Sequence, residues 1–220
     1  FKSNSGFDNA KFSLASWLYI KNGEIDSGDV LLGQGSANWH NGDDLHQLDV
    51  NNLAVHMSRQ PNGWRLDVPA LNLKTDGAQW PKGKVSLFWQ PEAITEAGEK
   101  LEELLRIRAS DLSLSHINPL LPIFSFLTPD MLDVWFHLQP QGDINQLALD
   151  IPLKQPEHLR FQGQWKNASW QQWQYVPGSN NTEGSIDGSL QRGTVSVALS
   201  QSTLPYDRVF RAPLEVSQAN

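Results

Sequence analysis

Apolar side chains occupy every second position in short runs along most of this chain. One run places Trp64, Leu66 and Val68 at alternate positions, with Asp67 among the polar residues between them. A period of two puts successive side chains on opposite faces of an extended strand, so each run predicts a β-strand with one buried and one solvated face. The pattern therefore predicts a mainly β chain.

Turn signals separate these runs at short intervals. Asn22-Gly23, Asp76-Gly77 and Pro140-Gln141-Gly142 each supply a residue that adopts positive φ easily or a proline with a fixed φ. Runs spaced in this way predict consecutive antiparallel hairpins. A sheet with an apolar face must cover it with a second sheet, helices or a ligand, and few helices are expected here. Function therefore depends on what covers that face.

Two segments depart from the alternation. Pro91–Ile107 has apolar residues near helical spacing, although Gly98 lies in its middle, and it predicts a helix. Ser115–His137 predicts a short helical hairpin, with Pro129 at the first position of a helix. We expect this hairpin to lie over the end or the open face of the sheet. The residues expected to provide the cover are Leu120, Phe124, Leu132, Trp135 and Phe136.

The 220 residues divide into three predicted segments of one elongated module. A first β segment covers 1–106, a strand with the helical hairpin covers 107–140, and a second β segment covers 141–220. Leu66–Pro69 and Leu149–Pro152 match in pattern, each at the end of a predicted strand. This weak repeat fits a sheet that is extended by similar hairpin units.

Composition excludes several classes of function. The formal net charge is -7, and the 17 Lys and Arg residues are scattered singly, so no nucleic-acid partner is expected. The chain has no cysteine, which excludes a disulfide framework, a thiol nucleophile and thiolate metal sites.

Catalytic and metal chemistry have few candidates in the sequence. His40, Asp43, Asp44 and His46 fall within seven residues and could wrap a divalent ion, but a polar hairpin turn explains the same residues. No Gly-x-Ser-x-Gly elbow, phosphate-binding loop or dinucleotide fingerprint occurs. We therefore predict no enzyme, no catalytic residue, no cofactor and no bound metal.

The nine tryptophans leave an alternative open. Trp165, Trp170 and Trp173 fall close together, and such a cluster could stack on sugar rings. Large aromatic residues are also enriched in sheets for packing alone, and we favour that interpretation. The alternative function is a non-enzymatic periplasmic carbohydrate-binding or protein-interaction β-domain.

Three stretches of the chain resemble the AsmA-like YhdP family of Gram-negative bacteria. They are 64–89, 107–151 and 161–216, and together they cover most of the sequence. The most specific parts are Pro140-x-Gly142 and the stretch from Trp170 through Pro177-Gly178 to Gly184-x-x-x-Gly188.

The resemblance implies a fold and a role. Members of the family are long periplasmic proteins with one N-terminal inner-membrane helix, and their repeating β-groove is thought to carry phospholipid between inner and outer membranes. This chain would be an internal piece without that helix. We therefore expect an extended, twisted antiparallel sheet, a β-groove of meander repeats, with a short helical hairpin. The implied partners are phospholipid acyl chains and the anchored full-length protein.

An acyl chain loses about 0.8 kcal/mol for each CH₂ that is exposed to water, so a lipid path needs an unbroken apolar strip. Alternating strands side by side supply such a strip. The residues expected to line it are Leu66, Val68, Val85, Leu87, Trp89, Leu112, Leu114, Leu147, Leu149, Ile151, Val195, Val197 and Leu199.

Overall fold

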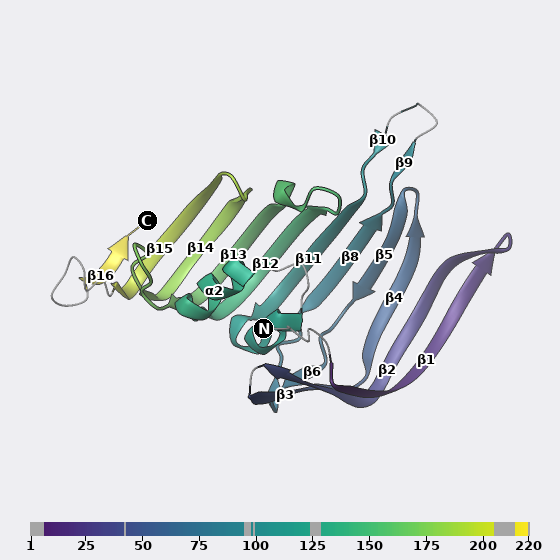
Figure 1. Cartoon of the computed structure of the whole chain (residues 1–220), viewed down its shortest axis with the longest axis horizontal. Coiled ribbons are helices and arrows are strands. Elements are labelled where there is room, and N and C mark those ends of the chain that lie inside the picture. Colours follow the sequence, from purple (N-terminus) through teal and green to yellow (C-terminus); the bar gives the residue numbers. More distant parts are fainter. Residues whose placement is uncertain are drawn as a thin grey trace.

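The computed structural model describes residues 7–41, 43–94, 98, 100–123, 129–204 and 214–219, with the backbone alone at 122, 199–204 and 214–219. Within this part of the chain, one antiparallel sheet of 14 strands dominates, and most of its strands lie side by side in one layer that does not close (Figure 1). The prediction of a mainly β, extended antiparallel sheet with a short helical segment is confirmed.

The large sheet includes most strands in chain order. Its members are β1 (Asn9–Lys21), β2 (Glu24–Asn41), β3 (Asp44–Val50), β4 (Leu53–Gln60), β5 (Gly63–Val68), β6 (Leu73–Thr75), β7 (Ala78–Gln79), β8 (Lys84–Gln90), β11 (Leu104–Ser113), β12 (Gln141–Pro152), β13 (Arg160–Trp170), β14 (Ser179–Ser189), β15 (Gly193–Leu204) and β16 (Leu214–Ala219). Their spatial order is β16-β15-β14-β13-β12-β11-β8-β5-β4-β2-β3-β6-β7, and β1 pairs with β2. Strands from all three predicted segments of the chain belong to this sheet, while the division into segments stays a prediction.

Several hairpins turn where the sequence signals predicted. Asn22 and Gly23 have φ values of 52° and 82°, and they join β1 to β2 where Lys21 pairs with Glu24. Asp76 and Gly77 join β6 to β7 with φ values of 50° and 81°. Two successive positive φ angles match the right-handed twist of the strands that such a turn connects.

The predicted helix over Pro91–Ile107 is wrong for the described residues of that segment. Ala93–Ile94 (β9) pairs with Lys100–Leu101 (β10), and Gly98 between them has a φ of 80°. Leu104 onward forms β11, which pairs with β8 on one edge and β12 on the other. Hydrogen bonds to two neighbouring strands satisfy the backbone N–H and C=O groups of β11 on both edges. These bonds outweigh the weak helical spacing of the apolar residues.

The predicted helical hairpin is present as several short pieces. They are α1 (Leu114–Ile117), the 3₁₀ helix η1 (Asn118–Ile123) and α2 (Pro129–Leu138). Helix α2 begins at Pro129 as predicted. A further 3₁₀ turn, η2 (Pro156–His158), follows β12.

One end of the sheet folds over into a second layer. The long strand β2 pairs with β4 over Ser27–Leu32 and with β3 over Gly35–Asn41, so two strands share one of its edges. Beyond β3, the short strands β6 and β7 continue this curl (Figure 1). We call this the capped end of the sheet, and the opposite end, with β9–β10 and the β1–β2 turn, the open end.

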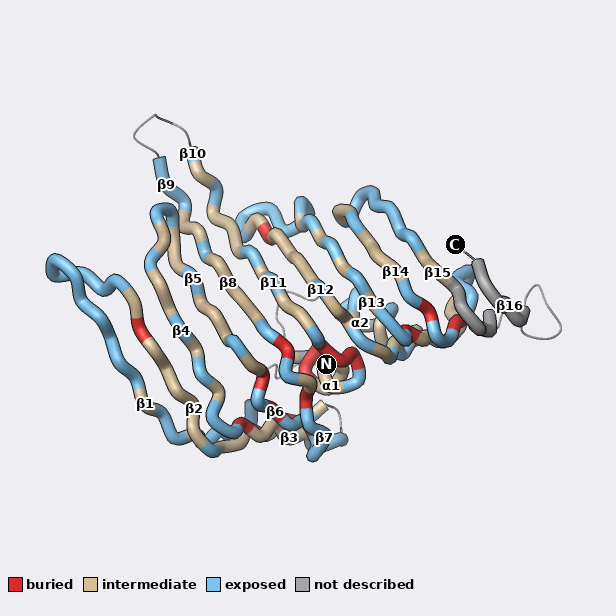
Figure 2. Tube along the Cα trace, turned by 180° about the vertical axis from the view of Figure 1, so that it is seen from behind, coloured by how far each residue is buried: buried red, intermediate tan, exposed pale blue. Residues whose placement is uncertain are grey.

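The packed core lies at the capped end. Trp39 is 1% exposed, and its Nε1 donates a hydrogen bond of 3.0 Å to the carbonyl oxygen of Pro119 in η1. Trp80 Nε1 donates to Thr75 Oγ1 at 2.8 Å. Figure 2 shows most buried positions gathered at this end. The buried residues of the cluster are Trp39, Val50, Leu71, Leu73, Trp80, Leu112 and Leu120.

Candidate functional site

The register of the strands separates the sheet into an apolar face and a polar face. Residues that pair directly across antiparallel strands point to the same side of the sheet. Leu66 pairs with Met57 and Leu87, and Leu87 pairs with Ile107. The alternate residues, such as Arg65, point to the other side.

One row of the apolar face crosses eight neighbouring strands without a charged side chain. Each member pairs with the next, from β1 to β13. The row is Leu18, Gly28, Met57, Leu66, Leu87, Ile107, Leu149 and Phe161. Seven steps of about 4.8 Å make this row about 34 Å long.

Two further rows run parallel to the first. Toward the open end, Trp64 pairs with Trp89, and Leu105 pairs with both Trp89 and Ile151. Toward the capped end, the row is Val68, Val85, Ala109, Leu147, Gly163, Ile186 and Val195.

The structure brings most of the predicted lining residues onto this one face. Val197 joins it next to Gly184, and Leu112 joins it next to Ile144. Leu114 instead lies in helix α1, because the strand ends at Ser113, and its side chain is buried. Leu199 pairs with Thr182, and its side chain lies outside the described residues. Whether these residues contact lipid stays a prediction.

Cover over the apolar face is densest at the capped end, although Ile151 in the row toward the open end is also buried. Ile117 and Ile123 of the helical segment pack against the buried cluster that includes Leu112 and Leu120, and Val85 and Leu147 of the sheet pack against the same cluster. Farther from the cap, Leu66, Leu87, Ile107, Leu149 and Phe161 are only half-buried and are not part of that core cluster.

The helical cover is thinner than the sequence suggested. Leu120 is buried in the core, whereas Leu132 and Trp135 of α2 are half-buried and Phe136 is exposed. Trp135 Nε1 donates to Asn118 Oδ1 at 2.8 Å, which holds α2 against η1. Phe124 lies outside the described residues.

The polar face carries paired charges. Arg65 Nε lies 2.9 Å from Asp67 Oδ2, and Arg108 Nη2 lies 2.7 Å from Asp150 Oδ1. A hollow of about 790 Å³ runs along this face, with Arg65, Arg108 and Gln162 among its lining residues. Hydrocarbon in that hollow would strip water from these ions, which costs free energy without a compensating bond. The polar face is therefore the less favourable side for contact with hydrocarbon.

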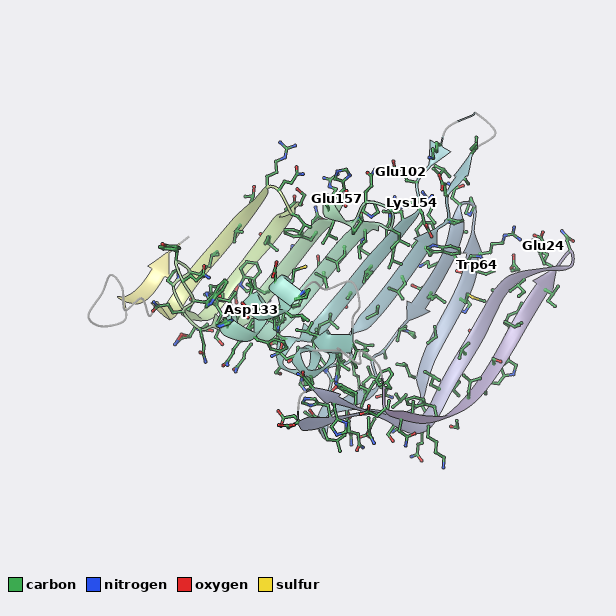
Figure 3. All side chains as sticks on the ribbon, in the orientation of Figure 1. Glu24, Trp64, Glu102, Asp133, Lys154 and Glu157 are labelled. Atoms are coloured by element: carbon green, nitrogen blue, oxygen red, sulfur yellow. The ribbon has the colours of Figure 1, made fainter. Side chains whose placement is uncertain are left out.

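The open end of the apolar face has a charged and aromatic rim. A hollow of about 680 Å³ lies there between the β4–β5 turn, Trp64, Trp89 and the β9–β10 hairpin. Arg59 pairs with Trp64 on the apolar face, and its guanidinium forms an ion pair with Glu24. Figure 3 shows Glu24 and Trp64 toward this end of the strands.

An ion-pair network fixes the hairpin β9–β10 beside this rim. Glu92 contacts Lys154 after β12 and lies 2.9 Å from Lys100 Nζ of β10. Hydrogen bonds from Lys154 and Lys100 lower the pKa of Glu92 to about 2, and the bond to Glu92 raises the pKa of Lys154. Glu92 is therefore ionised at neutral pH.

The residues of the candidate metal turn have separate partners. His40 Nδ1 lies 2.6 Å from Asp8 Oδ2, and His46 Nδ1 lies 2.8 Å from Asp76 Oδ2. His40 pairs with Leu45 and His46 pairs with Trp39, so the two histidines lie one register position apart. They therefore point to opposite faces of the β2–β3 ribbon. In the described ranges, no group of three or more His, Asp or Glu side chains is placed to hold a metal ion.

The three clustered tryptophans do not share one platform. Trp165 lies on the apolar face, where its Nε1 is 3.2 Å from Thr182 Oγ1. Trp170 Nε1 donates to the carbonyl oxygen of Pro177 at 2.9 Å, and the Trp173 ring lies 5.5 Å from that of His137. These contacts explain the tryptophans by packing and do not favour the sugar-stacking alternative.

Sequence reasoning missed several members of the apolar face. Leu105, Ile107 and Ala109 alternate in β11, but the helix predicted over Pro91–Ile107 obscured their period. Met57 and Phe161 also carry the period-two signal, each two residues from another apolar-face residue. Their alternation alone could have placed them on this face.

An open sheet with one uncovered apolar face and one charged face defines a class of protein that presents a continuous hydrophobic surface. The chain belongs to the YhdP family, whose model, described as YhdP protein, matches residues 1–220. The resemblance seen in the sequence is therefore confirmed.

One curated relative is the intermembrane phospholipid transporter YhdP of Escherichia coli (strain K12). It is 39% identical over 217 residues, a match that covers 98% of this chain and 17% of that protein. The chain thus spans less than a fifth of the length of this relative. No solved structure matches the chain significantly. No helix in the described part of the chain is both long and apolar enough to cross a bilayer.

Proposed function

We propose that this chain forms a section of a hydrophobic groove that carries phospholipid between the inner and outer membranes. The observation that supports the proposal is the uncovered apolar row from Leu18 to Phe161, which crosses eight strands. A soluble domain normally covers such a face with a second layer. Family membership and the name of the Escherichia coli relative indicate phospholipid as the covering ligand.

The proposed setting is the periplasm, within a longer protein that is anchored in the inner membrane. The chain would bind acyl chains by burial of apolar area, at about 25 cal/mol for each Å² removed from water. The proposal assigns no catalytic residue and no cofactor, because the proposed groove only shields hydrocarbon from water and carries out no reaction.

Photo-crosslinking at adjacent residues of β8 tests this proposal. Leu87 points to the apolar face and Ser86 to the polar face, so a benzoylphenylalanine at position 87 or 86 samples the two sides of one strand. In cells that express the full-length protein, we expect phospholipid adducts from position 87 and a background level from position 86. Equal labelling at both positions, or no lipid at position 87, would contradict the proposal.

A further inference from the structure

The two ends of the apolar face differ in a way that orients a bound lipid. The capped end is filled by packed side chains, including Trp39 and Leu112, and it leaves no room for a polar headgroup. The open end carries Trp64, Trp89 and Arg59 around a hollow of about 680 Å³. A lipid that lies along the strands must therefore place its headgroup at the open end.

The depth of the apolar face between these ends matches one lipid tail. Four residues separate Trp64 from Val68 on β5, which at about 3.4 Å for each residue is about 14 Å. One leaflet of a bilayer contains about 15 Å of hydrocarbon, half of its core of about 30 Å. Acyl chains on Leu66 would thus end near the cap when the headgroup lies beside Trp64.

Resting on the proposed function, we propose that Arg59 and Glu24 form the headgroup site for a phosphatidylethanolamine. In the free protein they form an ion pair with each other, and their side chains are 49% and 66% exposed. An exposed pair of this kind contributes little, so it can open at small cost. The guanidinium then binds the phosphate with two parallel hydrogen bonds, and the carboxylate meets the ammonium of ethanolamine.

The surroundings of Arg59 suit a position between hydrocarbon and water. Trp64 and Trp89 form a cross-strand pair directly beside it, and tryptophan prefers sites where one part of the ring is apolar and another is wet. Ile94 and Leu101 of the β9–β10 hairpin line the other side of the hollow. This hairpin would cover the glycerol region of the bound lipid.

The chain supplies a matched control for each charge. Arg65 is 50% exposed and paired with Asp67, so it resembles Arg59 in exposure and partner but lies on the polar face. We compare Arg59→Gln with Arg65→Gln, and Glu24→Gln with Asp67→Asn, in the full-length protein with benzoylphenylalanine at position 87. The probe is vesicles of equal phosphatidylethanolamine and phosphatidylglycerol, and mass spectrometry identifies the crosslinked lipids.

Arg59→Gln should lower the yield of both lipids about fivefold, as expected for loss of an exposed charge contact. Glu24→Gln should lower the ratio of phosphatidylethanolamine to phosphatidylglycerol, and both polar-face variants should match the parent. If Arg59→Gln equals Arg65→Gln while the parent still captures lipid, the headgroup site is wrong and the proposed function stands. If the parent captures no lipid at position 87, both fail. Hydrogen exchange in β4 and β5 verifies that the variants remain folded.

Discussion

Substitution of Leu149 by aspartate separates an open apolar face from a closed core. Leu149 is half-buried between Ile107 and Phe161 in the middle row. Full burial of a leucine side chain stabilises the fold by about 1.5 to 3 kcal/mol, so loss of a half-buried one should cost about 1 kcal/mol. A carboxylate at this position keeps its water, and the melting temperature should fall by only about 2 to 4 °C for a chain of this size.

Leu112 provides the matched control at the capped end. It lies on the same face but is 6% exposed in the packed core. An unpaired carboxylate there would be buried, at a cost of about 3 to 5 kcal/mol, so Leu112→Asp should lower the melting temperature by about 10 °C or more, or prevent folding. Differential scanning calorimetry of the two variants measures the contrast.

Leu149→Asp should have a large effect on lipid capture even though its effect on stability is small. Leu149→Asp interrupts the apolar row without unfolding the sheet, so crosslinking of phospholipid at position 87 should be lost while the protein stays folded. Leu149→Ala keeps the face apolar and should retain most of the capture. The reasoning is refuted if Leu149→Asp destabilises as much as Leu112→Asp, which would indicate a covered core, or if it leaves lipid capture unchanged.

Other consequences can be measured separately. A Cβ atom at Gly63 would clash with the backbone carbonyl oxygen of Trp89, whereas the nearest atom to one at Gly163 would be Ile186 Cγ2 at 3.2 Å. Gly63→Ala should therefore speed hydrogen exchange in β5 and β8 much more than Gly163→Ala does in β13. Trp39→Phe should cost about 1 to 3 kcal/mol in urea unfolding, because it leaves the half-buried carbonyl of Pro119 without its donor. Trp89→Phe, at a residue 40% exposed, should cost less than about 1 kcal/mol, and equal costs would contradict the assignment of the core. The pKa of Glu92 is lowered from 4.5 to about 2, so its stabilisation of the β9–β10 hairpin is complete above about pH 4.5 and is lost as the pH falls toward 2; hydrogen exchange of β9 and β10 should show this loss, and Glu92→Gln should remove it.

Local periodicity predicted much of the fold. The alternation of Trp64, Leu66 and Val68 fixes which side chains share a face once a strand forms, because the period of a strand is two. The turn at Asn22-Gly23 was also predictable, since few residue pairs accept two successive positive φ angles. These features depend only on neighbours in sequence.

The cap was not predictable from the same signals. It depends on the pairing of β2 with both β4 and β3 along a single edge. No local sequence pattern predicts that one strand will pair with two others on the same edge. The contact between Trp39 and Pro119 joins residues 80 positions apart. Register shifts also break the period, as between Ile144 and Gln146 in the pairing of β12 with β13. Long-range pairing decided these features.

The rim of the proposed groove was missed for a different reason. Arg59 interrupts the apolar alternation of β4, so the period-two signal alone does not mark it as part of a site. Its importance comes only from the pairing with Trp64 and the contact with Glu24, which lies 35 residues earlier. A charged residue at the end of an apolar row is informative once the opposite end is known to be closed.

The direction of lipid movement follows from the energies along the two axes of the apolar face. A step across the strands moves a tail about 4.8 Å, from Leu87 to Ile107 or from Ile107 to Leu149, and exchanges one aliphatic contact for another. A step out of the groove exposes hydrocarbon, and ten CH₂ groups would cost about 8 kcal/mol. A step toward the capped end meets the packed core around Leu112. On the proposed function, lipid therefore moves across the strands, with the charged rim guiding the headgroup and the aliphatic row guiding the tails.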